Sequence, residues 1–194
     1  MQEILIEGKR LRLRRATIDD INYIMALQFA PENLRFIVPF EREYHEKIIK
    51  SDNTQSLDVI IEERETKYAA GYFMIRGLDT DAKEMEWTHV IIGRKGLGYG
   101  HEAMKLLKAW TFLKKKFHRA WLDCKDYNEI AIHLYESEGL VREGLIRETL
   151  LTDGVYENLL IFGILDREYR ERRTEGKELS AWINPPLSDH VKEK

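Results

Sequence analysis

The sequence predicts an α/β (α+β) chain in which a central, mixed but mostly antiparallel twisted sheet is flanked by helices. Alternation of apolar and polar residues in short segments early in the chain indicates antiparallel strands. Apolar residues at helical spacing over 101–117 indicate a long amphipathic helix. Asp153-Gly154 between two apolar runs is typical of a β-hairpin. No proline lies between Pro39 and Pro185, as expected for regular structure.

The first half of the chain is predicted to run from a strand through helices into three further strands. Leu11–Arg15 alternates apolar and basic residues, which indicates a strand with one solvated face. A helix that Asp19 or Asp20 could cap follows it, and an irregular segment then leads to a charged helix near 41–50. The further strands are expected at 57–62, 69–75 and Glu84–Ile92.

The second half is predicted to alternate helices and strands before a final hairpin. The helix at 101–117 comes first, and the later elements are a strand at 118–124, a helix at 128–138, strands at 145–152 and Val155–Leu165, and a charged helix within 166–178. The length of 194 residues predicts one domain, over 1–179. Residues 180–194 are expected to form a tail that docks by Trp182 and Ile183 or frays.

The composition excludes several classes of function. With 31 basic and 34 acidic residues the net charge is −3, which gives no long-range attraction for nucleic acid. No apolar run approaches the roughly 18 residues that cross a bilayer, so no membrane partner is expected. Cys124 is the single cysteine, and His101, His118 and His133 lack metal-ligand spacing, so neither an intrachain disulfide nor a metal is expected. Residues 1–15 lack a secretory signal pattern, so a cytoplasmic location is the expectation.

Three glycines at alternate positions, Gly96, Gly98 and Gly100, lie between a predicted strand and the long helix. Glycine lets an anion approach the main chain, and a helix N-terminus presents free N–H groups, so this loop indicates phosphate binding. A glycine-rich turn that only changes the chain direction is the simpler alternative. The loop is not a P-loop, because the Gly-x-x-x-x-Gly-Lys-Ser/Thr pattern is absent.

The same segment also satisfies a dinucleotide-binding pattern. Gly98, Gly100 and Ala103 fit Gly-x-Gly-x-x-Gly/Ala, and Asp123 ends the next predicted strand about 20 residues later. That pattern would make the protein an NAD-dependent oxidoreductase with Asp123 on the ribose. The antiparallel strands before the loop and the hairpin after it speak against this, and Asp123 is otherwise a strand-end carboxylate that faces water or pairs with a neighbour.

Two motifs resemble those of a known family. Residues 94–100 (RKGLGYG) are similar to a pyrophosphate loop Gln/Arg-x-x-Gly-x-Gly/Ala, and residues 128–140 (NEIAIHLYESEGL) are similar to a helix Asn-x-x-Ala-x-x-Leu-Tyr-x-x-x-Gly-Phe. Both belong to the GCN5-related N-acetyltransferases (GNAT), which transfer acetyl from acetyl-CoA to an amine. The expected element order resembles this GNAT fold over about 8–165. Gly93 stands where the family has its Gln or Arg, which implies that Arg94 takes that role or that the contact is missing.

The resemblance implies a site for acetyl-CoA. The pyrophosphate would lie on the glycine loop, and the pantetheine would lie between Glu84–Ile92 and 121–124, two strands that splay apart in this family. Asn128 would bond the pantetheine, and Tyr135 would protonate the departing thiolate. Helical spacing places both on one face, although Asn128 is also a good N-cap and Tyr135 an ordinary core aromatic. The implied binding residues are Val90, Ile91, Ile92, Arg94, Lys95, Gly96, Leu97, Gly98, Tyr99, Gly100, Asn128 and Tyr135.

The general base is sought on the central predicted strand, which carries Glu86 and His89. In a regular strand they point to opposite faces, so only one can serve unless a bulge intervenes. The family often places a glutamate on this strand, so the resemblance favours Glu86. Cys124 is expected to be a small buried hydrophobe, because direct transfer needs no nucleophile.

The sequence therefore predicts an acetyl-CoA-dependent N-acetyltransferase that acts by direct attack in a ternary complex. The acceptor is a primary amine, either a protein N-terminus, a polyamine or another small amine, entering between residues 20–50 and the hairpin at 153–154. One alternative is the NAD-dependent oxidoreductase, against which the 128–140 motif speaks. The other is a non-catalytic acyl-CoA-binding module, suggested by Gly93. A homodimer through the last strands or the tail is left open.

Overall fold

A single twisted sheet organises the part of the chain that the computed structural model describes, residues 2–50 and 55–179. Within it, eight strands follow the order β1-β2-β3-β4-β5-β6-β8-β7. All neighbours are antiparallel except β5 and β6, which are parallel. The strands are β1 (Ile4–Glu7), β2 (Leu11–Arg15), β3 (Ser56–Glu63), β4 (Ala69–Arg76), β5 (Glu84–Ile92), β6 (Arg119–Lys125), β7 (Val141–Thr152) and β8 (Val155–Leu165).

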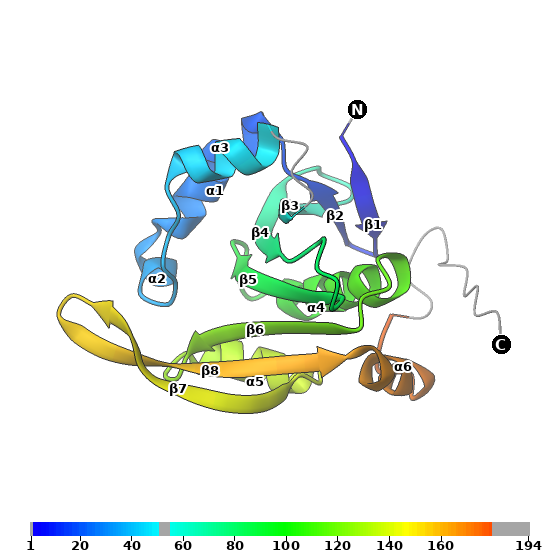
Figure 1. Ribbon diagram of the computed structural model, residues 1–194. Helices are drawn as coiled ribbons and strands as arrows, with labels where there is room; N and C mark the ends of the chain where they lie inside the picture. Colours follow the sequence, from blue (N-terminus) through cyan, green and yellow to red (C-terminus); the bar gives the residue numbers. More distant parts are fainter. Residues whose placement is uncertain (1, 51–54, 180–194) are drawn as a thin grey trace.

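Helices cover both faces of this sheet (Figure 1). The helices α1 (Ile21–Gln28) and α3 (Arg42–Lys50) pack on one face, where Ile24 and Ile48 join Tyr72 and Met74 in a smaller core. On the other face, α4 (Tyr99–Ala109) and α5 (Glu129–Ser137) pack against the larger core. The short helix α2 (Pro31–Leu34) follows α1, and α6 (Asp166–Thr174) follows β8. No helix in the described ranges is both long and apolar enough to cross a membrane.

The predicted strands are confirmed, with one addition. Leu11–Arg15, Glu84–Ile92 and Val155–Leu165 have the expected bounds, and Asp153-Gly154 forms the turn of the last hairpin. The prediction missed β1, because four residues on a sheet edge are too short for alternation to be recognised. The strand expected at 145–152 begins earlier, at Val141, since bulges after Arg142 and Ile146 interrupt its pattern.

The helix boundaries needed two corrections. A 3₁₀ turn (Ile18–Asp20) precedes α1. Asp20 is the N-cap residue of α1, as predicted, but its carboxylate accepts from the Thr17 amide (2.8 Å) and from Arg14 (2.8 Å) and makes no capping hydrogen bond to α1. The helix expected at 101–117 begins at Tyr99, and its last part, Trp110–Lys114, is a π-helical turn. The helix expected at 128–138 is α5, with Asn128 as its N-cap. The tail at 180–194, including Trp182 and Ile183, lies outside the described residues.

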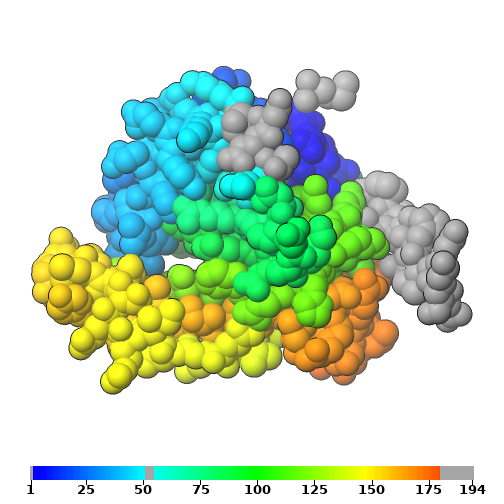
Figure 2. All heavy atoms as spheres, in the orientation of Figure 1, coloured from blue at the N-terminus to red at the C-terminus, as the bar shows by residue number. Residues whose placement is uncertain are grey.

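The hairpin of β7 and β8 extends beyond the body of the molecule, below α1–α3 (Figures 1 and 2). Its strand β7 is an edge of the sheet and exposes Val141, Leu145, Ile146 and Leu151. A homodimer through the last strands or the tail stays a prediction. The arrangement also corrects the dinucleotide alternative, because β5, α4 and β6 form one parallel unit inside an otherwise antiparallel sheet and not the repeated series that such a fold needs.

Candidate active site

The site begins where the two parallel strands part. β5 and β6 pair only over Glu84–Glu86 with Arg119–Trp121, and the sheet splits beyond that point. The N–H of Gly93 donates to Ala70 O on β4 (2.8 Å). Because N–H direction alternates along a strand, the amides of Val90 and Ile92 point into the split, whereas that of Ile91 points toward β4. Of the main-chain amides of Val90, Ile91 and Ile92, which the resemblance places in the binding site, two therefore face the opening.

A bulge at Thr88 changes which side chains reach the site. In the β4–β5 ladder Met74 lies opposite His89 and Ile75 opposite Trp87, so Thr88 is an extra residue. Before the bulge Trp87 packs into the larger core, and after it Ile91 packs into the smaller core. Glu86 and His89 consequently lie on the same face, the one that α1 and α3 cover. In a regular strand these two side chains would point to opposite faces, but the bulge places them on the same one.

Two adjoining pockets run through the split. The inner pocket has a volume of about 210 Å³ and is lined by Thr88, His89, Val90, Asp123, Cys124 and, among others, Leu150 and Leu159. The outer pocket, of about 160 Å³, reaches from Ile92 to Lys95, Glu32 and Asn33. The residues common to both are Phe36, Ile37, Val90, Asn128, Ala131 and Tyr135. Since Val90 and His89 belong to opposite faces, the inner pocket crosses the plane of the sheet.

Asn128 is the N-cap of α5, and its side-chain NH₂ group has no partner in the described ranges. Its Oδ1 accepts from the Ala131 amide (3.2 Å), which caps α5. Its amide NH₂ donates to no residue in the described ranges and lines both pockets. The capping bond fixes the orientation of the side chain and leaves the NH₂ group unused. A role of Asn128 as the N-cap of α5 is therefore compatible with a bond from its NH₂ to a ligand.

Tyr135 and Cys124 lie side by side at the inner pocket. The Tyr135 ring packs against Phe162, with 5.7 Å between centroids, while its hydroxyl makes no hydrogen bond to any described residue. Burial, followed by the nearby Cys124 and Asp123, raises the Tyr135 pKa, so the phenol keeps its proton at neutral pH. Burial and the charge of Asp123 raise the Cys124 pKa to about 12, which disfavours a thiolate nucleophile.

Asp123 was not assigned to this site from the sequence except as a ribose ligand. It lines the inner pocket beside Cys124 and Tyr135. Burial, with a further contribution from the negative charge of Glu86, raises its pKa to about 6. His89, on β5, also lines this pocket. Burial lowers its pKa to about 4, and its Nδ1 lies 2.6 Å from Tyr72 Oη.

The glycine loop lies at the outer end of the split. Gly96 and Gly98 have φ values of +78° and +70°, a region that side chains disfavour, whereas Gly100 lies in α4, where an added Cβ would meet Leu134 at 3.4 Å. The amides of 96–98 donate to no group in the parts of the chain that the structure describes. Such free amides before a helix N-terminus suit a phosphate.

Residues far from the loop in sequence hold it in place. The Arg10 guanidinium donates to Leu97 O (2.8 Å) and to Glu102 (2.7 Å), and its carbon lies 5.0 Å from the centre of the Tyr99 ring. Glu102 also accepts from the amides of Arg10 and Leu11. The loop is thus fixed to the start of β2, which no local motif indicates.

The position of Gly93 explains the departure from the family pattern. A Cβ there would lie 2.8 Å from Tyr23 Oη and 3.0 Å from Leu27, so a side chain would collide with α1. The next residue, Arg94, pairs with Glu63, whose carboxylate also accepts from Tyr99 Oη (3.0 Å). Lys95 Nζ contacts Asn33 Oδ1 at 3.2 Å. Arg94 and Lys95 therefore stand at the rim with protein partners.

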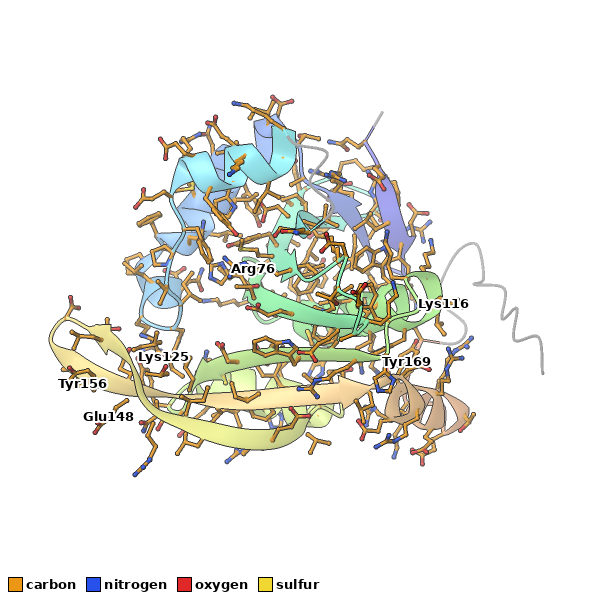
Figure 3. All side chains as sticks on the ribbon, in the orientation of Figure 1. Arg76, Lys116, Lys125, Glu148, Tyr156 and Tyr169 are labelled. Carbon is orange, nitrogen blue, oxygen red and sulfur yellow. The ribbon has the colours of Figure 1, made fainter. Side chains whose placement is uncertain are left out.

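The segment after α1 bridges the mouth of the split. On one side Asn33 meets Lys95, and on the other Tyr127 Oη donates to Arg35 O (3.0 Å). Figure 3 shows Lys125 in the same region, between α2 and the hairpin, where its Nζ lies 2.7 Å from Glu157 Oε2. This segment supplies Phe36 and Ile37 to both pockets.

The structure brings together most of the predicted residues. Val90, Ile92, Asn128 and Tyr135 surround the split, and the loop 96–100 lies at its outer end. Glu86 lies on the face that α1 and α3 cover, as His89 does, but it does not line the inner pocket. Sequence reasoning missed Thr88, the wall formed by residues 36–40 and the role of Arg10, because these depend on the bulge and on long-range packing. In the described ranges no group of three or more His, Cys, Asp or Glu is arranged to hold a metal.

A pocket that crosses a split sheet, with free amides at one end and carboxylates at the other, suits transfer of a group between two ligands. Comparison with known sequences identifies the class: an acetyltransferase (GNAT) domain matches residues 10–141. The chain belongs to this GNAT acetyltransferase family. The expected fold and family are thereby confirmed.

Individual relatives are more distant. The SPbeta prophage-derived uncharacterized N-acetyltransferase YokL of Bacillus subtilis is 25% identical over 99 residues, and the match spans 50% of this chain and 56% of that relative. The spermidine N-acetyltransferase of Vibrio cholerae, solved with CoA and spermine, has a TM-score of 0.74 at 23% identity, covering 83% of this chain and 98% of that one. A chimera of the Vibrio cholerae enzyme SpeG with hSSAT has a TM-score of 0.75 at 24% identity and covers 84% of this chain and 100% of that one.

Proposed function

We propose that this protein transfers an acetyl group from acetyl-CoA to a primary amine of the polyamine class, by direct attack in a ternary complex. The observation that carries the proposal is the inner pocket, which crosses the sheet through the split. A donor on the α4–α5 side and an acceptor on the α1–α3 side would meet there without a covalent enzyme intermediate. The raised pKa of Cys124, about 12, agrees with direct transfer.

The donor site would use the main chain and α5. The free amides of 96–98 and the N-terminus of α4 would hold the pyrophosphate, with Arg94 and Lys95 at the rim. The NH₂ of Asn128 would bond the pantetheine, and the amides of Val90 and Ile92 would face the thioester carbonyl. Acetyl-CoA supplies the activated acetyl group as a thioester. Tyr135, protonated and without a partner in the described ranges, would give a proton to the leaving sulfur.

The acceptor site favours a cationic amine. Glu86 and Asp123 lie on the α1–α3 side of the split and make no ion pair within the described chain. The solved structures similar to this one include spermidine N-acetyltransferases, one of them with spermine bound, which makes polyamines the first acceptors to test. A peptide with a free N-terminus is the second.

The first experiment measures thermal unfolding with acetyl-CoA, CoA and NAD in parallel. At about 100 times the dissociation constant a ligand adds ~2.7 kcal/mol, which for a domain of this size raises Tm by roughly 5 to 11 °C. We expect a shift with acetyl-CoA and CoA and none with NAD. Thiol release is then followed with spermidine and with a short peptide as acceptors.

Each negative result identifies a different alternative. Stabilisation by NAD alone would overturn acetyl transfer in favour of the oxidoreductase. Stabilisation by acetyl-CoA without thiol release for any amine would indicate the non-catalytic acyl-CoA-binding module. Thiol release with the peptide but not with spermidine would overturn the polyamine class and keep the reaction.

A further inference from the structure

Asp123 lies on the acceptor side of the split, just beyond the last pair between β5 and β6. Along β6 the side chains of Ala120, Leu122 and Cys124 belong to the larger core, so Trp121 and Asp123 face the other way. Glu86 is paired with Trp121 and shares that face. The two carboxylates therefore occupy the same side of the sheet, one on each strand that borders the opening.

Neither carboxylate is neutralised by the protein. Within the described residues, Asp123 and Glu86 accept no hydrogen bond and form no ion pair. Two cations at neighbouring positions of the sheet are engaged elsewhere. Lys125, next on the same face of β6, pairs with Glu157 at 2.7 Å. Arg76, opposite Glu86 in the β4–β5 ladder, donates to Tyr44 Oη (2.9 Å) and lies over the Phe40 ring, 4.8 Å from its centre.

We propose that Asp123 accepts the proton that the acceptor ammonium must lose before attack, while Glu86 holds that ammonium beside it. The inference rests on the proposed function and moves the proton-accepting role from Glu86 to Asp123. The reason is position: Asp123 lines the inner pocket together with Tyr135, whereas Glu86 stands outside it. A base must reach the nitrogen that attacks the thioester, and the proton donor to sulfur marks that place.

The surroundings suit Asp123 to this task near neutral pH. Four titratable groups line the inner pocket: His89, Asp123, Cys124 and Tyr135. The pKa of His89 is lowered to about 4, that of Cys124 is raised to about 12 and that of Tyr135 is raised further. Burial and the charge of Glu86 bring the pKa of Asp123 to about 6. Asp123 is therefore mostly ionised at pH 7, and its carboxylate is a stronger base than that of an ordinary aspartate.

The proton balance of the reaction closes with these groups. The ammonium R–NH₃⁺ gives one proton to the Asp123 carboxylate, which frees the nitrogen lone pair. That pair forms the N–C bond to the acetyl carbon, and the C–S bond breaks with its electrons on sulfur. The sulfur takes the Tyr135 hydroxyl proton, and the tyrosinate recovers a proton from the attacking nitrogen. Asp123 then releases its proton to solvent, so one proton leaves per turnover.

The test compares Asp123→Asn, Glu86→Gln and wild type by kcat/KM for spermidine from pH 5 to 9, followed by thiol release. Asp153→Asn is the matched control, since Asp153 is an exposed aspartate in the hairpin turn with φ +49°, a conformation that asparagine accepts. Acetyl-CoA must stabilise every variant as it does wild type, which shows that the donor site is intact.

We expect wild type and Asp153→Asn to lose activity below an apparent pKa near 6. Asp123→Asn should reduce kcat/KM at pH 7 by about 100-fold or more, without an acidic limb near 6. Glu86→Gln should raise KM for spermidine and move the limb to lower pH, because it removes the charge that helps to raise the pKa of Asp123. A ¹³C-carboxyl NMR titration of aspartate-labelled full-length protein should show a group titrating near pH 6 that Asp123→Asn removes.

Wild-type activity in Asp123→Asn, or an acidic limb that disappears in Glu86→Gln and stays in Asp123→Asn, would overturn the proposal while acetyl transfer stands. An aspartate set titrating only near pH 4 would also overturn it. If wild type binds acetyl-CoA but releases no thiol with any amine, the proposed function fails, and the proton-accepting role fails with it.

Discussion

Two polar clusters in this protein are built in opposite ways. At one end of α4, Lys108 is fully buried and its Nζ lies 2.9 Å from Glu138 Oε2 and 2.6 Å from Glu178 Oε1. Arg172 Nε adds a second cation to Glu178 at 2.8 Å. In the split, Asp123 and Glu86 have no such partner among the described residues. One cluster is neutralised from within the chain, and the other is not.

The Lys108 cluster stabilises the fold, whereas the carboxylates in the split belong to the acceptor site proposed above. The Lys108 cluster ties α4 to the end of α5 and to the segment after α6, and removing one member would leave an uncompensated buried charge. The negative charge of Glu86 raises the pKa of Asp123 across the split, and in the proposed function a cationic acceptor would offset this repulsion. Four substitutions test this difference.

The largest effect is expected for Lys108→Met. It removes the fully buried ammonium beside Glu138 and Glu178 and leaves Glu178 with Arg172, and removing one partner of a buried pair costs about 3–5 kcal/mol. Urea unfolding measures the loss as a lower midpoint. The matched control is Lys177→Met, whose pair with Glu175 is more than half exposed on both sides and is worth less than about 1 kcal/mol. Equal losses in the two variants would contradict the assigned difference.

Tyr135→Phe tests the split without disturbing packing. The hydroxyl has no hydrogen-bond partner in the described chain, so the free energy of unfolding and the binding of acetyl-CoA should stay close to wild type. We expect kcat to fall by about 100-fold, a barrier increase of about 2.7 kcal/mol, because the leaving sulfur loses its proton donor. Tyr156→Phe, at an exposed hairpin position labelled in Figure 3, should change nothing. Unchanged kcat in Tyr135→Phe would remove the proton-donor role.

Asp123→Asn should stabilise the folded protein at neutral pH. The folded-state pKa of about 6 lies above the ordinary aspartate value of 3.8, so the folded state binds the proton more tightly and loses stability as pH rises from about 4 through 6. About two pKa units, reduced for partial exposure, correspond to about 2 kcal/mol at pH 7. The variant should gain this at pH 7 and little at pH 4 in urea unfolding. Asp153→Asn should show no such pH dependence, and equal gains at both pH values would contradict the assignment.

Gly96→Ala is expected to have the smallest effect. Its φ of +78° costs a side chain about 1 kcal/mol, and an added Cβ meets no atom within 4 Å, so the loss is conformational. The added methyl group would also stand where the phosphate approaches, so the thermal shift with CoA should shrink. Gly144→Ala is the matched control, because that site is equally open and its φ is outside the left-handed region. A full CoA shift in Gly96→Ala would argue against phosphate binding on this loop.

Local patterns were sufficient for most of the fold. Glu84–Ile92 was predicted with its observed bounds because alternation and β-branched residues indicate a strand locally. Asp153-Gly154 forms the turn between β7 and β8 because both residues accept the positive φ that this turn requires. Asn128 and Tyr135 could be placed together because helical spacing alone puts them on one face. These features depend on residues close in sequence.

Tertiary structure decided the details of the site. The Thr88 bulge, which brings Glu86 and His89 to one face, depends on the register with β4, and the register is a property of two strands. Arg10 supports the glycine loop from 87 residues away, and nothing in its neighbourhood along the chain indicates this. The raised pKa of Asp123 follows from burial and from the charge of Glu86 across the split. Residue type and spacing therefore determined which elements form and what chemistry they carry, whereas a side chain's direction, burial and proton affinity depend on neighbours that only the folded sheet brings close.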